Sequence, residues 1–249
     1  MNKQAIKQWC ATLPTLDNLR WLGIWCHVTQ ALFDASCALR DLECLPIKWS
    51  NIKHLDAIAE FSALRYLQIG SSTRIESIAP LVALGKLRLL EIENFKLITD
   101  FSPLLALRSL ESLAVTGSLW TRQNVGSLEP FTHMTWLSSL AIDTTHVASL
   151  RPLAKLTGLR SLGLGGRIPM AEYAWLAGKL PDTECRWFDP YLKLAGAGLG
   201  PCATCHNDSK VMLTSKGGGV VCSVYEQAKV TKHAAAFAAI KAGSTAGQE

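Results

Sequence analysis

The sequence predicts an α/β solenoid, in which short parallel strands stack and short helices or turns return the chain between them. Three observations lead to this fold class. A hydrophobic motif, Leu-x-x-Leu-x-(Leu/Ile/Val), recurs seven times at a nearly constant interval. Prolines recur at one fixed distance before the motif. The first residues carry apolar side chains at helical spacing, which would cover the open end of such a stack.

The motif sets the period and the inward face of each strand. Its copies begin at Leu19, Leu42, Leu64, Leu87, Leu110, Leu137 and Leu159, so the intervals are 23, 22, 23, 23, 27 and 22 residues. Intervals of roughly 20–29 residues with this apolar signature are typical of leucine-rich repeats. In the third copy, alternation places Leu67 and Ile69 on one side of a strand. We therefore expect a right-handed leucine-rich repeat solenoid with a parallel sheet on its concave side.

The prolines predict what joins the strands. Each of four prolines lies seven residues before a repeat-opening leucine: Pro80, Pro103, Pro130 and Pro152. A proline in the first turn of a helix loses no hydrogen bond, because that N–H has no partner within the helix. Few residues remain between strands, so we expect short α-helices or 3-10 turns on the convex side.

Three stretches resemble the 22-residue repeats of the internalin-like family: "IESIAPLVALGKLRLLEI", "ITDFSPLLALRSLESLAV" and "VASLRPLAKLTGLRSLGL". The resemblance covers roughly residues 16–188 and implies the solenoid fold. One departure concerns the asparagine that usually follows the strand. The corresponding positions here hold Ser50, Ser72, Phe95, Ser118 and Thr145, and hydroxyl groups bond the backbone more weakly.

Composition and repeat boundaries predict three parts. Residues 1–15 are expected to form an N-terminal cap helix, residues 16–188 the solenoid with a degenerate eighth repeat, and residues 189–249 a C-terminal cysteine-containing module. The chain is 49% hydrophobic and 18% charged, which excludes a disordered protein, and its net charge of +5 contains no block of like charge. Neither a secretory signal nor a membrane span is apparent, so we expect a cytoplasmic protein.

The outward positions of the strands predict a binding surface with an aromatic end and an acidic centre. Exposed tryptophan and tyrosine are enriched at binding hot spots. Alternatively, these rings pack against the N-terminal helix or simply lie on a half-exposed edge. The acidic centre argues against a phosphate backbone as ligand and favours a basic peptide or protein surface. The candidate partner-binding residues are Trp21, Trp25, Lys48, Trp49, Tyr66, Gln68, Glu91, Glu93 and Asp143.

The C-terminal region resembles a zinc ribbon. A Cys202-x-x-Cys205 pair precedes an expected hairpin over residues 211–222, which ends at Cys222, and an alanine-rich segment over residues 223–242 is expected to be helical. Tyr225 holds the position of the fourth cysteine of a ribbon. A zinc site therefore needs His233 or His206, and the candidate ligands are Cys202, Cys205, Cys222 and His233. The alternative is a decayed ribbon with free thiols.

The Cys202–His206 segment also matches the attachment signature for c-type haem, but no export signal accompanies it, so no haem is expected. No nucleophile–base motif or phosphate-binding glycine loop is present in the sequence. We therefore expect a non-enzymatic protein that binds a protein partner on its concave face, as an inhibitor, immunity-type or scaffold protein. The alternative is nucleic-acid association through the tail and its lysines: Lys210, Lys216, Lys229 and Lys232.

Overall fold

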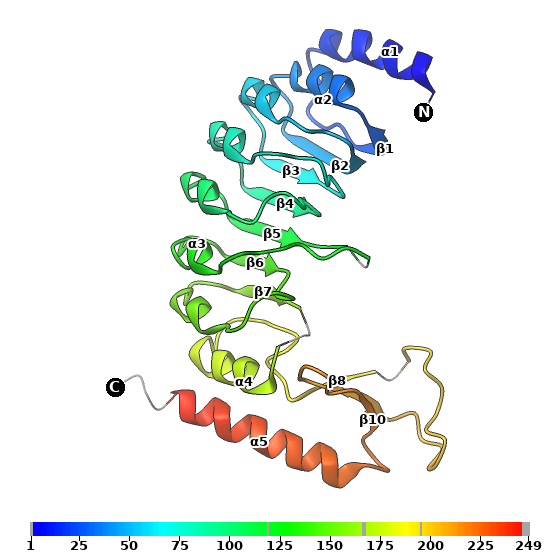
Figure 1. Cartoon of the computed structure of the whole chain (residues 1–249), viewed down its shortest axis with the longest axis vertical. Helices are drawn as coiled ribbons and strands as arrows, with labels where there is room; N and C mark the ends of the chain where they lie inside the picture. The colour runs from blue at the N-terminus through cyan, green and yellow to red at the C-terminus, as the bar shows by residue number, and fades with distance from the viewer. Residues whose placement is uncertain (1, 119, 166–167, 195, 246–249) are drawn as a thin grey trace.

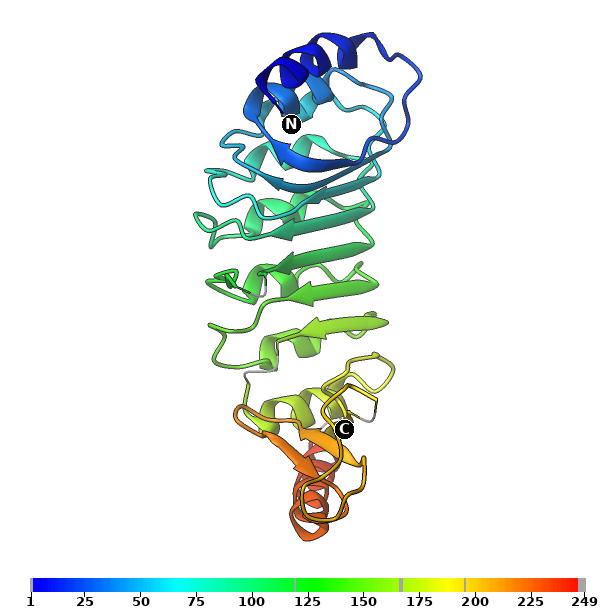
Figure 2. The ribbon, with the colours of Figure 1, turned by 90° about the vertical axis from the view of Figure 1, so that its right-hand side faces the viewer.

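The computed structural model describes residues 2–118, 120–165, 168–194 and 196–245. Seven strands form one parallel sheet in chain order, which confirms the expected solenoid (Figures 1 and 2). The strands are β1 (Ile24–Val28), β2 (Cys44–Ser50), β3 (Tyr66–Ile69), β4 (Leu89–Glu93), β5 (Ser112–Thr116), β6 (Ser139–Ile142) and β7 (Ser161–Leu164). Figure 2 gives a view onto the face of this sheet, in which the strands run across the long axis of the molecule.

The register of the sheet follows the leucine motif. Leu67 pairs with Leu90, and Leu90 pairs in turn with Leu113. Because equivalent residues of successive repeats are paired across neighbouring strands, each inward apolar side chain packs against the equivalent side chain of the next repeat. Only β1 departs from this regularity, with a register shift between Ile24 and His27.

Short helical segments return the chain along the convex side, as expected. Proline stands in the first turn of η3, η4, α3 and η5. The convex segments are α2 (Gln30–Cys37), η2 (Asp56–Glu60), η3 (Ala79–Ala83), η4 (Ser102–Ala106), α3 (Glu129–Thr132), η5 (Arg151–Lys155) and α4 (Met170–Lys179), where η marks a 3-10 helix.

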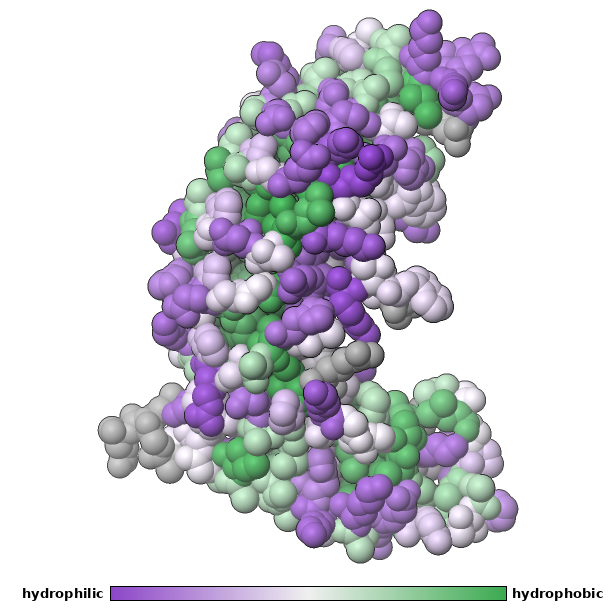
Figure 3. Space-filling model, viewed as in Figure 1, coloured by the Kyte–Doolittle hydropathy of each residue, from purple (hydrophilic) through white to green (hydrophobic). Residues whose placement is uncertain are grey.

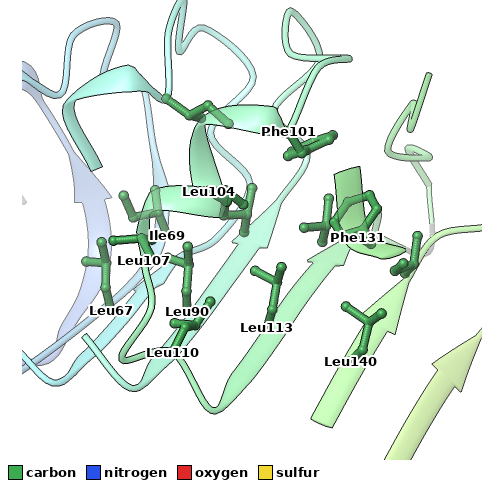
Figure 4. Packing of buried hydrophobic residues seen from close by; sticks show 14 of the residues in the cluster. Leu67, Ile69, Leu90, Phe101, Leu104, Leu107, Leu110, Leu113, Phe131 and Leu140 are labelled. Carbon is green, nitrogen blue, oxygen red and sulfur yellow. The ribbon is translucent and has the colours of Figure 1, made fainter. Parts of the chain in front are cut away.

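One continuous hydrophobic core runs the length of the solenoid. Figure 4 shows Leu67, Leu90 and Leu113 in a row beneath the convex turns. Phe101 and Phe131 close the core from the turn side, with ring centroids 5.8 Å apart. Each repeat buries its leucines against its neighbours, so the stack as a whole is the stable unit.

Both ends of the stack are covered. At the N-terminal end, α1 (Lys3–Thr12) is capped by the Asn2 side chain, which accepts a hydrogen bond from Ala5 N at 2.8 Å, and η1 (Leu13–Thr15) follows. At the other end, Glu184 forms a β-bridge with Ser161, where the eighth repeat was expected. The indole of Trp187 donates to the Leu164 carbonyl at 2.7 Å.

The C-terminal module, residues 189–245, contains a three-stranded antiparallel sheet and a long helix. The expected hairpin is present as β9 (Lys210–Leu213) and β10 (Val220–Cys222), and the expected helix is α5 (Gln227–Thr245). The sequence did not indicate β8 (Tyr191–Lys193), which pairs with β9.

The module is attached to the solenoid by hydrogen bonds and by helix packing. Thr214 Oγ1 donates to the Asp189 carbonyl at 2.6 Å, and Lys216 N donates to the Ile168 carbonyl at 2.8 Å. Helix α5 packs against α4, and the small sheet projects on the concave side (Figure 1). Among the described residues, no helix has the length and apolar character needed to cross a membrane.

Candidate functional site

The outward rows of the concave face lie where the repeat pattern predicts them. Trp21 forms a bridge with Cys44, and Cys44 pairs with Tyr66 in the next strand. A second row runs from Gln68 to Glu91 and onward. Because the strands are parallel and in register, these rows bring together side chains that are 22 or 23 residues apart in the sequence.

The N-terminal end of this face is an exposed aromatic surface. The side chains of Trp21 and Trp25 are 54% and 59% exposed, so the cap helix does not cover them. Trp49 is 37% exposed, and the Lys48 ammonium lies 4.8 Å from the centroid of its ring. These aromatics are therefore partly exposed, and Trp25 also lines a groove together with Trp9 of the cap helix. Large exposed apolar patches on the surface of a monomer mark interaction sites.

Gly23 leaves room for the Trp21 ring beside the backbone. A Cβ atom at residue 23 would stand 2.4 Å from Cη2 of the Trp21 indole. Any larger residue would displace the ring. The indole therefore fills space that a side chain at residue 23 would take.

An apolar groove of about 380 Å³ continues this surface between α1 and β1. The sequence analysis did not identify it, because its walls come from the cap helix and the first repeat together. The only signal in the sequence was the helical spacing of apolar side chains in residues 1–15. The lining residues are Trp9, Leu13, Leu22, Gly23, Ile24, Trp25, Cys26 and Leu32.

The acidic centre adjoins the aromatic end. The Tyr66 hydroxyl donates to Glu91 Oε1 at 3.1 Å and to Gln68 Oε1 at 3.3 Å. Burial and the neighbouring Glu91 carboxylate raise the pKa of Tyr66 to about 12, so its hydroxyl stays a donor at neutral pH. Glu93 is half-buried and accepts from Ser71 Oγ at 3.0 Å. Among the described residues, neither glutamate has an ion-pair partner.

Two residues depart from the expected surface. Asp143 was expected to be exposed, but it is 7% exposed and holds a loop. Its carboxylate accepts hydrogen bonds from Gln123 N at 3.1 Å and Thr145 N at 3.0 Å. Leu89, which the sequence analysis did not select, is 43% exposed in the same row as Tyr66.

The long interval between the fifth and sixth repeats forms a projecting loop on the concave side (Figure 1). Trp120 belongs to this loop and is 93% exposed. Ser118 Oγ accepts hydrogen bonds from Trp120 N at 3.2 Å and Thr121 N at 3.0 Å, which shapes the loop. Figure 3 shows the concave side hollowed below this loop, with the C-terminal module bounding the hollow.

The C-terminal module contains a cluster of three cysteines. The Sγ atoms of Cys202, Cys205 and Cys222 all lie within 4.8 Å of one another, and those of Cys205 and Cys222 are 3.4 Å apart. Cys202 and Cys222 are buried, whereas Cys205 is half-exposed. Three thiols this close are suited to a thiophilic metal ion, because soft sulfur ligands select zinc, copper(I) and similar ions.

The backbone around the cluster donates hydrogen bonds to sulfur. Two hydrogen bonds from Asn207 lower the pKa of the Cys205 thiol to about 7: the larger effect comes from the backbone N–H and the smaller one from the side chain. Tyr225 N donates to Cys222 Sγ at 3.4 Å. The turn after Cys205 is closed by His206, which has a φ of 54° and donates from its backbone N to the Cys202 carbonyl at 2.9 Å. The N–H groups that donate to sulfur stabilise the thiolate forms of the cysteines.

The histidines considered as fourth ligands do not join the cluster. Within the part of the chain that the structure describes, the three cysteines alone form the group, and neither His233 nor His206 belongs to it. His233 lies on α5, where its Nε2 atom is buried without a hydrogen-bond partner. The expected four-ligand set with His233 is therefore reduced to three thiols in this structure.

Comparison with known proteins supports the fold. No protein-family model and no curated protein sequence matches the chain. Two internalins from Listeria monocytogenes are structurally similar to it. Internalin C2 has a TM-score of 0.54 and 20% identity over 72% of this chain and 79% of its own. The internalin inlF has a TM-score of 0.50 and 24% identity over 60% of this chain.

The likeness is one of architecture, because both identities lie below 25%. The chain spans 42% of the length of the inlF chain. The matched architecture, a parallel sheet with short convex helices, is the one described above. The chain has the leucine-rich repeat solenoid fold of the internalins.

Proposed function

We propose that this protein is a non-enzymatic interaction protein that holds a protein partner on the N-terminal half of its concave face. The observation that carries the proposal is the exposure of Trp21 and Trp25 at the β1 end of the concave face, together with Glu91 and Glu93 on β4, which have no ion-pair partner among the described residues. Large rigid rings desolvate at low entropic cost, and acids without an ion-pair partner on the same face favour basic groups on a partner. An inhibitor, immunity-type or scaffold role fits such a surface.

A comparison of partner capture by surface variants tests this proposal. The full chain is used as bait in extracts of its native cells, with and without nuclease. We expect Trp21→Ala combined with Trp25→Ala to reduce capture of a specific protein about tenfold or more, because hot-spot rings each contribute roughly 2 kcal/mol or more. Val82→Ser is the matched control, since Val82 is also exposed but lies on the convex η3.

Two outcomes contradict the proposal. Undiminished capture of the same protein by the tryptophan variant would exclude the aromatic surface. Capture that survives in the tryptophan variant but disappears after nuclease treatment would favour the alternative, nucleic-acid association through the C-terminal module. Thermal unfolding of each variant verifies that a loss of capture is not a loss of folding.

We further propose that Cys202, Cys205 and Cys222 bind one zinc ion, which stabilises the C-terminal module. The close approach of the three sulfurs and the N–H groups directed at them support this. Elemental analysis of the full chain, purified without chelators, is expected to find about one zinc per chain. Cys205→Ser should lose it, while Cys44→Ser, which changes a cysteine outside the cluster, should keep it. Wild-type protein with less than about 0.1 zinc per chain would exclude a zinc site.

A further inference from the structure

The three-cysteine cluster supplies one ligand fewer than a closed zinc site needs. Structural zinc sites are almost always tetrahedral and use four protein ligands, whereas sites that react or exchange ligands keep one position open. No fourth His, Cys, Asp or Glu of the described residues joins the cluster. The question is therefore what occupies the remaining position when an ion is bound.

Tyr225 stands at the sequence position where a zinc ribbon has its fourth cysteine. Its backbone N–H donates to Cys222 Sγ at 3.4 Å, so the Cys222–Tyr225 turn folds back towards the sulfur cluster. Its side chain is 61% exposed. A phenol is a poorer ligand for zinc than a thiolate. The turn therefore carries no thiolate at the sequence position of the fourth ligand.

Exposure within the cluster is uneven. Cys205 is half-exposed, whereas Cys202 and Cys222 are buried. Cys205 is therefore the member of the cluster from whose side an incoming ligand would approach a bound ion.

Charge selects the class of that ligand. Three thiolates and a divalent ion carry a net charge of −1, and a fourth thiolate would raise it to −2. Lys210 pairs with Cys222 across the hairpin, but its Nζ donates to the Leu199 carbonyl at 2.7 Å, and Lys229 is paired with Glu226 at 3.3 Å, so both ammonium groups are already engaged. A neutral nitrogen donor is favoured over an anionic one.

We propose that an ion bound by Cys202, Cys205 and Cys222 keeps its fourth position open to an exchangeable neutral donor from outside the module. The position holds water in the isolated protein and takes a histidine imidazole when one is offered. This inference rests on the zinc proposal above, and it makes the module a site where a partner histidine docks onto a bound metal ion.

Cobalt(II) replaces zinc in the test, because its visible spectrum reports the number and type of ligands. The apo full chain is loaded with one equivalent of cobalt and titrated with imidazole. We expect the ligand-field bands to shift in a saturable manner. Tyr225→Cys should close the site, because its thiolate is held beside the ion by the turn: its bands become those of a four-thiolate site and imidazole no longer shifts them. Tyr225→Phe is the matched control and should behave like the wild type.

The outcomes separate the two proposals. Absence of cobalt–thiolate bands in the wild type would overturn the zinc site and the open position together. Bands that imidazole does not shift, in a protein that binds zinc, would overturn the open position alone. So would a spectral change on His233→Ala, because it would show that His233 supplies the fourth ligand within the chain. The wild-type titration and the His233 variant decide the matter even if Tyr225→Cys does not fold.

Discussion

Buried polar side chains hold the turns that follow the strands. Ser50 and Ser72 share a hydrogen bond between their hydroxyls at 2.6 Å, and both are buried. Where Phe95 takes the corresponding position, Gln123 bonds the backbone instead. It accepts from Phe95 N at 2.8 Å and donates to the Ile98 carbonyl at 3.0 Å. A side chain from the insertion thus replaces the asparagine of the usual repeat.

Gln123→Ala is expected to destabilise the protein by about 1–3 kcal/mol. The variant leaves the Phe95 N–H and the Ile98 carbonyl without their partner in a site from which water is excluded, and unsatisfied buried groups cost this much. Urea-induced unfolding measures the loss. Gln68→Ala, on the open concave face, is the control and should change the free energy of unfolding by less than about 0.5 kcal/mol. Equal stability of the two variants would mean that Gln123 does not hold the turn.

The helices α4 and α5 cross at a glycine. A Cβ atom at Gly178 would lie 1.9 Å from Ser244 Oγ and 2.4 Å from the Lys241 carbonyl oxygen. The hydroxyl can rotate away, but the carbonyl belongs to the backbone of α5 and moves only with the helix. This crossing, together with Phe237, which is buried in the solenoid core, fixes α5 to the end of the stack.

Gly178→Ala is therefore expected to loosen α5, at a cost of about 1–3 kcal/mol for the overpacked contact. Hydrogen exchange of the α5 amides should accelerate relative to those of the solenoid strands. Gly243→Ala is the matched control on α5 itself, since a Cβ atom there meets nothing within 4 Å. It should stabilise the helix by about 0.5–1 kcal/mol, because alanine is the better helix former. Slower or unchanged exchange in Gly178→Ala would refute this account of the crossing.

Across the whole molecule, the solenoid presents three zones on one face. Aromatic rings stand at the N-terminal end, carboxylates lie in the middle, and small residues cover the last repeats. The C-terminal module projects on the same side, at the end opposite the aromatic rings (Figure 1). A partner on the N-terminal half would reach the proposed open metal position only if it also spanned the middle of this face.

The candidate surface was predictable as far as it depends on the repeat. Trp21, Tyr66 and Glu91 lie where their distance from the opening leucine places them, because a parallel sheet in register aligns equal positions. Asp143 sits at an equivalent position but is covered by the inserted loop, which the repeat pattern does not describe. His233 shares a module with the cysteines, yet the sequence does not determine which side of α5 faces them.

By itself, the sequence determined the solenoid, the register of its sheet, the convex turns and the hairpin that brings Cys222 near the Cys202–Cys205 pair. These features depend on local periodicity, with a period of two in strands and about 22 residues between repeats. Only the tertiary structure decided that Trp21 and Trp25 are uncovered, that Asp143 is buried and that the cluster has three ligands. Those outcomes depend on how α1, the inserted loop and α5 pack against the stack, and no local pattern specifies contacts between segments so far apart in the chain.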